Sequence, residues 1–388
     1  MQYLVYLIYP AMLLLLLWGA KFSKNNEWNE GFLSLYQTKC IQGFTAICIM
    51  LHHIGQEMCA SWQPYKLYPG LEFFVPLGYL FVSVFFFFSG FGLYVSFEKK
   101  PEYLSKGFLR KRALPLLIGF YVSGWVFLIA RIIMGEKMSP WKWFCYISGY
   151  GLPNPYSWFA IVMPLFYLIF YLAFKYCKKK PVLVVTICVF IYTFIGTCIN
   201  HNNYLMRGQW WYNCVHLFWI GLLVGKNREK FVENLKKKYI LKLVLSIIGF
   251  GVFYYLSRVT QGIFSYYGED AGLPQTITVL YRWICLVAEM LTSWFLVLSM
   301  LMLGLKISIG NRFMEFFGKI TLEFYLIHGL IVEFFSYRFC DIVQPIVRIE
   351  NGALMIIVVT ALSVPLALLL KKVCHIFDKS KKNASEGQ

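Results

Sequence analysis

Charged residues are scarce in this chain of 388 residues. Asp, Glu, Lys and Arg together make up 14% of the sequence, whereas hydrophobic residues make up 59%. A soluble globular domain carries about 25% charged residues, so this chain has too few to cover a soluble surface. We therefore expect an all-α fold, a polytopic transmembrane helix bundle, although the length alone would allow two or three soluble domains.

The sequence also lacks the cysteine spacing of a metal site. Its eleven cysteines fall mostly inside apolar segments, where free thiols behave as small hydrophobic side chains. We expect no bound metal. Cys59, Cys145 and Cys340 lie nearest the expected outer face, and a disulfide among them stays an open alternative.

Apolar segments recur along the whole chain at the length of a membrane-spanning helix, about 17–25 residues. Hydropathy predicts eleven of them, which would form a core of about ten helices and one extra helix at the N-terminus. Their approximate limits are 2–20, 38–58, 73–97, 113–134, 157–176, 181–199, 210–226, 240–257, 282–305, 317–338 and 353–373.

Positive charge is concentrated in alternate connections between these segments. The net charge is +18, and 28 of the 37 Lys and Arg residues lie in six connections, namely 21–39, 98–112, 175–180, 226–242, 306–319 and 371–382. This positive-inside pattern, with eleven spans, predicts that the C-terminus lies in the cytoplasm and the N-terminus outside. Because this distribution of Lys and Arg is explained by the orientation of the chain in the membrane, the positive net charge does not indicate nucleic acid as a partner. We expect contacts with membrane lipid instead.

Three parts follow from this pattern. Residues 1–20 are as apolar as a signal peptide but lack a basic n-region and a small-residue cleavage site, so we expect an extra transmembrane helix. Residues 38–373 would form the membrane core, and residues 374–388 a polar cytoplasmic tail. Because this tail is too short for another domain, the chemistry is expected among the helices.

His53 is the most informative residue, because ionisable groups inside a bilayer are costly and are functional candidates by default. It follows His52 in a mostly apolar segment. Gln42 lies eleven residues earlier on the same helix face, about 16 Å away along the axis, and Lys39 precedes Gln42 by about one turn. A neutral imidazole can take a proton from a hydroxyl. The alternative is a hydrogen-bonded histidine pair with a structural role.

Two further motifs can each be explained, when considered alone, without a role in catalysis or ligand binding. The segment 85–94 contains Phe-Phe-Ser-Gly-Phe-Gly, whose glycines favour close helix packing and whose Ser89 adds a hydroxyl. The segment 106–115 contains Arg110, Lys111 and Arg112. These residues suit a phosphate-bearing cofactor, but they suit anionic lipid and simple topology as well.

The last constellation is Gly-Lys-Ile-Thr-Leu-Glu-Phe-Tyr-Leu-Ile-His at 318–328. Glu323 and His328 are both intramembrane ionisable groups, but five residues turn a helix by about 140°, so they do not share a face. Thr321 and His328 do share one. Glu289 is another buried carboxylate. At least one of these groups is expected to form a structural hydrogen bond between helices.

The order of these motifs resembles one known family, the acyltransferase-3 family of integral membrane acyltransferases. The resemblance covers about 38–373, and each motif is short although their order is specific. The motifs are Gln-Gly and His-His within 42–53, Phe-Phe-Ser-Gly-Phe at 87–91, Phe-Leu-x-Lys-Arg at 108–112, Trp-Phe at 158–159, Phe-Trp-Ile-Gly-Leu-Leu-Val-Gly at 218–225 and the segment 318–328.

The resemblance implies transfer of an acyl group from cytosolic acyl-CoA, typically acetyl-CoA, to a hydroxyl of an extracytoplasmic glycan or its lipid-linked precursor. The acceptor would be a cell-envelope or exported polysaccharide. His53 would be the general base, with Glu323 and His328 as further catalytic candidates. The acyl-CoA site would comprise Lys39, Gln42, Ser89, Arg110, Lys111 and Arg112.

Two positions depart from the family pattern. The family's basic residue before the histidine falls on Gln42, so Lys39 is the expected substitute. The second arginine of its Arg-x-x-Arg falls on Pro115, and only Arg112 matches. These losses leave an inactive scaffold as an alternative. A transporter or flippase for a glycan or acyl donor is another, since midplane polar residues fit it, but no inverted repeat or broken helix pair is visible.

Overall fold

The computed structural model describes residues 2–63, 66–100, 102–104, 107–199, 208–264, 273–336 and 347–386, with side chains from residue 3 to residue 375. Regular structure in these ranges is almost entirely helical, which confirms the all-α prediction. The α-helices are α1 (Ile8–Leu17), α2 (Leu35–Met58), α3 (Gly78–Lys99), α4 (Phe108–Arg112), α5 (Leu114–Ile133), α6 (Pro140–Ser148), α7 (Phe159–Tyr176), α8 (Pro181–Cys198), α9 (Leu217–Lys226), α10 (Arg228–Lys236), α11 (Tyr239–Ile263), α12 (Gln275–Gly304), α13 (Arg312–Lys319), α14 (Thr321–Phe335) and α15 (Gly352–Glu386).

Short elements complete the fold. Three 3-10 helices precede longer helices, namely η1 (Gln2–Leu7), η2 (Glu72–Leu77) and η3 (Gln209–Trp211). Two strands of two residues, β1 (Lys21–Phe22) and β2 (Ile307–Ser308), pair antiparallel with Lys21 opposite Ser308. This small ribbon ties the N-terminal part of the chain to the connection after α12.

Seven helices of the described chain are long and apolar enough to cross a membrane, by length and composition. They correspond to predicted spans 73–97, 113–134, 157–176, 181–199, 240–257, 282–305 and 353–373, and they make this a multi-pass membrane protein. The other four predicted spans are helical too, with differences. The N-terminal one changes from η1 to α1, and α9 reaches only ten residues. α2 is long but carries polar residues, and the span at 317–338 breaks at Ile320 between α13 and α14.

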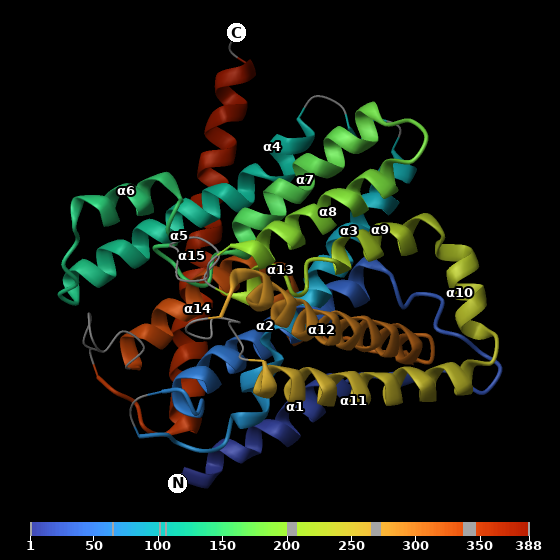
Figure 1. Ribbon diagram of the computed structural model, residues 1–388, viewed down its shortest axis with the longest axis horizontal. Coiled ribbons are helices and arrows are strands. Elements are labelled where there is room, and N and C mark those ends of the chain that lie inside the picture. Colours follow the sequence, from blue (N-terminus) through green and yellow to red (C-terminus); the bar gives the residue numbers. More distant parts are fainter. Residues whose placement is uncertain are drawn as a thin grey trace.

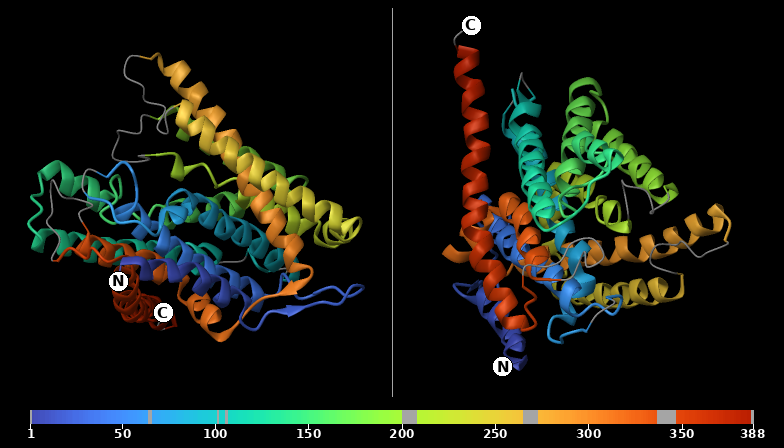
Figure 2. Two further views of the ribbon diagram at one scale, coloured as in Figure 1. Left: turned by 90° about the horizontal axis from the view of Figure 1, so that it is seen from below. Right: turned by 90° about the vertical axis from the view of Figure 1, so that its left-hand side faces the viewer.

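The long helices cross one another at large angles instead of forming a parallel bundle. Figure 1 shows α11 and α12 side by side, whereas α15 runs in another direction, away from this pair, and carries the C-terminus beyond the other helices. Figure 2 shows the α11–α12 hairpin running obliquely along one side of the molecule. α2 packs against α3, α13 and α14, and α14 also contacts α5 and α15. The two helices that carry His53 and His328 are therefore neighbours within the fold.

Glycines allow two of these crossings. A Cβ at Gly90 of α3 would lie 1.9 Å from the carbonyl oxygen of Phe218, and one at Gly221 of α9 would lie 2.1 Å from that of Phe87. The Phe-Phe-Ser-Gly-Phe and Phe-Trp-Ile-Gly motifs thus pack against each other through their backbones. Gly43 of α2 and Gly318 of α13 make a similar contact. Close packing therefore accounts for these glycines, as small residues do at membrane helix contacts.

The basic connections are joined to one another at one end of the molecule, which we call the basic end. Lys236 pairs with Glu30 at 2.7 Å, and Arg228 pairs with Glu98. Lys371 donates a hydrogen bond of 2.7 Å to the carbonyl oxygen of Lys319. These contacts involve five of the six basic connections predicted from the sequence, and only 175–180 takes no part in them.

Cysteines make no disulfide among the described residues. Cys145 is buried and free, and Cys59 is half-buried and free. Cys340 lies outside the described residues, so the structure does not test a disulfide that involves it.

The glycine crossing predicts a difference between two neighbouring glycines of α3. Gly90→Ala should lower the free energy of unfolding by about 1–3 kcal/mol, because the added methyl group overpacks the contact with α9. Gly92→Ala is the control, since no atom lies within 4 Å of its Cβ position. Thermal unfolding in detergent would compare the two, and equal melting temperatures would contradict the close-packing account.

Candidate active site

His53 and His328 meet at the contact between α2 and α14. Nδ1 of His53 lies 2.7 Å from Nε2 of His328, and the two rings are nearly parallel with their centroids 4.9 Å apart. His328 is fully buried, and His53 is half-buried. Two histidines that are 275 residues apart in sequence thus form one hydrogen-bonded pair.

The hydrogen bonds assign the tautomers of this pair. Nδ1 of His328 lies 2.8 Å from the carbonyl oxygen of Phe324, and because a carbonyl only accepts, this nitrogen carries the proton. Nε2 of neutral His328 is then an acceptor, so Nδ1 of His53 must donate to it. The unprotonated nitrogen of neutral His53 is therefore Nε2. A ring held in this tautomer has the form required of a general base.

His52 belongs to a different contact. Its Nδ1 donates a hydrogen bond of 3.0 Å to the carbonyl oxygen of Phe74, and its ring packs directly on Gly78 at the start of α3. The ring centroid is 5.0 Å from that of His53, with a tilt between the planes. His52 thus anchors α2 to η2 and α3, whereas His53 faces α14.

The loop between α6 and α7 contacts the pair through Tyr156. The Tyr156 ring lies 4.5 Å from the His53 ring, and its ring packs on Gly329 of α14. Asn154 is fully buried and holds this loop in place. Its Nδ2 donates to the carbonyl oxygen of Leu326 at 2.8 Å, and its Oδ1 accepts from the backbone N–H of Tyr156 at 3.0 Å. One amide thus fixes the position of Tyr156 relative to the helix that carries His328.

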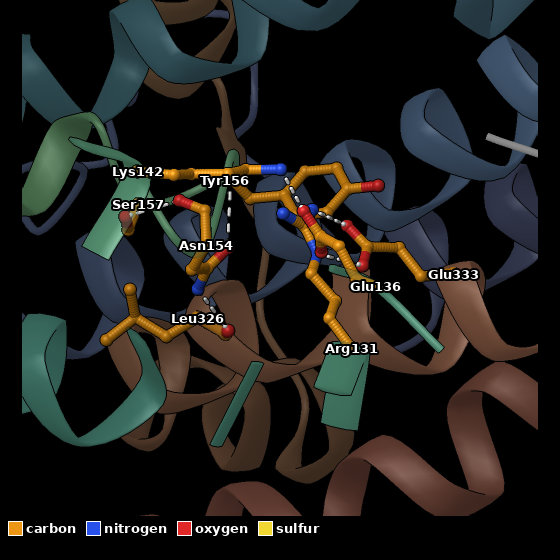
Figure 3. Close-up of polar contacts among 8 residues, drawn as sticks. All are labelled: Arg131, Glu136, Lys142, Asn154, Tyr156, Ser157, Leu326 and Glu333. Atoms are coloured by element: carbon orange, nitrogen blue, oxygen red, sulfur yellow. Dashed lines mark hydrogen bonds and ion pairs between the residues drawn. The ribbon is translucent and has the colours of Figure 1, made fainter. Parts of the chain in front are cut away.

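A buried ion pair joins α14 to α5 beyond the histidine pair. Nε and Nη2 of Arg131 donate to the two carboxylate oxygens of Glu333 at 3.2 and 3.0 Å, which is a bidentate arrangement. Glu136 lies beside Arg131 and also pairs with Lys142 (Figure 3). A bidentate pair of this kind fixes the relative position of its two side chains, because both hydrogen bonds form only in one arrangement of the guanidinium and the carboxylate. α14, which carries His328, is therefore held both by the loop between α6 and α7 and by α5.

The predicted donor-site residues gather at the basic end of the bundle. Lys39 interacts electrostatically with Glu323, and Glu323 in turn interacts electrostatically with Lys371 and His375. Arg112 also acts on Lys39. We call Lys39, Arg112, Lys371 and Glu323 the charged cluster. The structure thus places Glu323 with the candidate donor site, whereas His328 pairs with His53.

Tyr167 of α7 links two more predicted residues to this cluster. Its hydroxyl lies close to Ser89, and it also interacts electrostatically with Arg112. The Arg112 guanidinium also lies over the Tyr103 ring, 5.7 Å from its centroid. Arg110 and Lys111 are exposed on the same short helix, and Gln42 is half-buried on α2. Lys39, Ser89 and Arg112 come together, although they are far apart in the sequence.

Comparison with known families decides the identity at this point. A model of an acyltransferase domain, Acyl_transf_3, matches residues 35–372, which is nearly the whole chain. The chain belongs to the acyltransferase-3 family. No curated protein and no solved structure matches the chain. Among the residues described for this acyltransferase, no group of three or more His, Cys, Asp or Glu residues could hold a metal ion.

Several residues around the site of this acyltransferase are absent from the sequence prediction. Arg131 and Glu333 carried a usable signal, because opposite charges inside two apolar spans are expected to pair. Tyr167 and Lys371 did not, since aromatic and basic residues are common at span ends. Asn154 lies in a loop without periodicity, so its contacts depend on the folded chain.

The ion pair predicts opposite effects of breaking and replacing it. Arg131→Met should lower the free energy of unfolding of the acyltransferase by about 3–5 kcal/mol, because Glu333 stays buried without its bidentate partner. The double variant Arg131→Met with Glu333→Leu should recover much of this loss. Thermal unfolding of the three proteins would test this, and a double variant less stable than Arg131→Met would show that the pair does not act as a unit.

Proposed function

We propose that this membrane acyltransferase moves an acyl group, typically acetyl, from cytosolic acyl-CoA to a hydroxyl of a cell-envelope or exported polysaccharide, or of its lipid-linked precursor. The observation that carries the proposal is the hydrogen bond between His53 and His328. It makes Nε2 the unprotonated nitrogen of His53, a half-buried residue of α2. Membership of the acyltransferase-3 family supplies the reaction class.

The donor is proposed to bind at the charged cluster. Its three cations exceed its one carboxylate, which suits the phosphates of acyl-CoA, and Arg110 and Lys111 extend the positive surface on α4. Arginine can hold phosphate through two hydrogen bonds. Lys39 lies near Arg112 and supplies the positive charge that Gln42 lacks. Lys39 would thus compensate for one of the two departures from the family pattern, that at Gln42.

α2 connects the two sites. Lys39 and His53 are fourteen residues apart, which is about 21 Å along a helix and a nearly integral number of turns. The pantetheine arm of CoA is proposed to extend along α2, so that the thioester reaches His53 while the phosphates stay at the basic end. The basic end is proposed to face the cytoplasm from the plasma membrane. The acceptor hydroxyl would then approach His53 from the outer side of this membrane.

The transfer step follows from the tautomer of His53. Nε2 of His53 takes the proton of the acceptor hydroxyl while the oxygen attacks the thioester carbonyl carbon. The carbon–sulfur bond breaks, and the CoA sulfur leaves with the proton that His53 carried. His328 accepts a hydrogen bond from His53 throughout, so the positive charge on the protonated ring is stabilised by His328 and the Phe324 carbonyl oxygen.

Replacing the two members of the pair should separate their roles. His53→Ala should lower the rate of acyl transfer by about 10²–10⁴-fold, because the general base is lost. His328→Ala should reduce kcat less, since the base remains but its tautomer is no longer fixed. Transfer from labelled acetyl-CoA to envelope glycan by purified protein would give both rates.

His52→Ala is the matched control for these variants. Its ring contacts Phe74 and Gly78 instead of His328, so this variant should keep most of the activity. Equal, mild losses in His52→Ala and His53→Ala would show that the two histidines serve only to pack the helices.

The charged cluster predicts a donor-specific defect. Arg112→Ala should raise the acyl-CoA concentration needed for half-maximal rate, by about tenfold or more, because a charged hydrogen bond to phosphate contributes about 1.5–3 kcal/mol. Lys237→Ala is the control, since Lys237 is exposed in another basic connection and pairs only locally with Glu233 among the described residues. Binding of acyl-CoA to protein in detergent would distinguish them, and wild-type affinity in Arg112→Ala would remove Arg112 from the site.

A further inference from the structure

A row of aromatic and basic side chains on α7 continues outward from the candidate donor site. Tyr167, Tyr171 and Lys175 follow at intervals of four residues, so they lie on one face of this helix. The row begins at Tyr167, which lies close to Ser89 and interacts electrostatically with Arg112. It ends at Lys175, which is exposed in the last turn of α7. The row thus leads from the bundle to the surface.

The ammonium group of Lys175 is held in place on this row. Its Nζ donates a hydrogen bond of 2.8 Å to the hydroxyl of Tyr171. The same nitrogen lies 5.0 Å from the centroid of the Tyr171 ring and 5.2 Å from that of the Tyr176 ring. We call Tyr171, Lys175 and Tyr176 the α7 patch. Because Lys175 folds back to Tyr171, its charge lies about one helical turn beyond Tyr167, or about 6 Å along the axis.

Stacked rings connect the α7 patch with α4, which packs against α7 (Figure 1). The Phe108 ring of α4 stacks on that of Tyr171 with centroids 5.8 Å apart, and it meets the Tyr103 ring edge to face at 5.3 Å. The Arg112 guanidinium in turn lies over the Tyr103 ring. The face of α7 that carries Tyr171 and Lys175 is therefore turned toward the helix of Arg112.

Positive charge dominates the two connections that meet at this place. Residues 98–112 and 175–180 together contain ten Lys and Arg residues and two carboxylates, Glu98 and Glu102. Glu98 is already ion-paired with a residue of α10, and Glu102 is exposed. No ion pair within the described parts of the chain neutralises Lys175. This surface therefore attracts an anion with several negative charges.

The nucleotide end of CoA matches this arrangement. CoA carries a diphosphate on the 5′ side of its ribose and a separate phosphate on O3′. With the diphosphate at Arg112, the ribose would extend along the row and bring the O3′ phosphate to Lys175, whose ammonium binds phosphate as a point charge. The Tyr176 ring is 69% exposed and offers a surface on which adenine can stack.

An anionic lipid headgroup is the other source of a phosphate at the end of a membrane helix. Such a headgroup brings no aromatic ring. It would use Lys175 alone, without Tyr176 and without the connection through Tyr103 and Phe108 to Arg112. A nucleotide uses the whole row, and we therefore favour it over the lipid.

We propose that the α7 patch binds the 3′-phosphoadenosine part of the acyl-CoA donor, with Lys175 on the O3′ phosphate and Tyr176 against adenine. Tyr171 is a positioning residue, because its hydroxyl holds the Lys175 ammonium. This inference rests on the proposed function and adds specificity to it. The patch would select CoA thioesters over acyl groups on phosphopantetheine, which lacks the nucleotide.

Kinetics with two donors would test the subsite, namely acetyl-CoA and acetyl-3′-dephospho-CoA, which lacks only the O3′ phosphate. In phosphatidylcholine vesicles with envelope glycan as acceptor, Lys175→Ala should raise the KM for acetyl-CoA about three- to tenfold, because it removes a charged contact at a site screened by water. Its kcat and its KM for acetyl-3′-dephospho-CoA should stay unchanged. Tyr171→Phe should have the same donor-specific effect on KM, by a smaller factor.

Lys226→Ala is the matched control, since Lys226 is also an exposed lysine in the last turn of an apolar helix, α9. It should change neither KM. Equal KM values of wild type for the two donors, or an equal rise for both in Lys175→Ala, would overturn the inference. A defect of Lys175→Ala that is the same for both donors and appears only with added phosphatidylglycerol would assign Lys175 to a lipid headgroup instead.

Binding of adenosine 3′,5′-bisphosphate separates this inference from the proposed function. By calorimetry, wild type should bind it more tightly than adenosine 5′-phosphate, and Lys175→Ala should remove most of this difference. No binding of the bisphosphate, or equal binding of the two nucleotides, would also overturn the subsite. If wild type transferred no acyl group but bound the bisphosphate through Lys175, the proposed function would fail while the nucleotide site stood.

Discussion

The arrangement depends on one hydrogen bond, between Nδ1 of His53 and Nε2 of His328. It needs α2 and α14 at a fixed separation and rotation, because an error of one residue would turn either ring away by about 100°. The surrounding contacts supply this precision. Gly43 and Gly318 bring α2 against α13, directly before α14. The Arg131–Glu333 pair and the bond from Asn154 then hold α14 against α5 and the loop that carries Tyr156.

The proposed binding of the donor phosphates and the proposed proton transfer lie at different ends of the same helix, α2. Lys39 lies with Arg112 at the basic end, whereas His53 lies fourteen residues further along α2, among buried aromatic rings. A phosphate-bearing donor needs cations at a wet surface, and a general base needs a neutral imidazole in a confined place. Under the proposed function one helix, α2, would meet both needs, and α2 is more polar than the seven helices that qualify as spans by composition.

The sequence predicts the composition-driven features and misses those that depend on helix rotation. Scarcity of charge and regular apolar runs were enough for the all-α membrane fold. Helical spacing placed Lys39, Gln42 and His53 on one face of α2. The pairing of His53 with His328 was not predictable, because it depends on the break at Ile320 and on how α14 is turned after it. The grouping of Ser89 with Arg112 through Tyr167 joins three helices, and no local pattern encodes it.

The most direct test of the account follows an isotopically labelled acyl group through the membrane. Sealed, right-side-out vesicles that contain the protein and enclose labelled acetyl-CoA would be incubated with envelope glycan on the outside, and the glycan would be analysed by mass spectrometry. The account predicts labelled acyl esters on the external glycan with wild type and none with His53→Ala. Labelled glycan at equal levels in both, or glycan moved across the membrane without label, would contradict it.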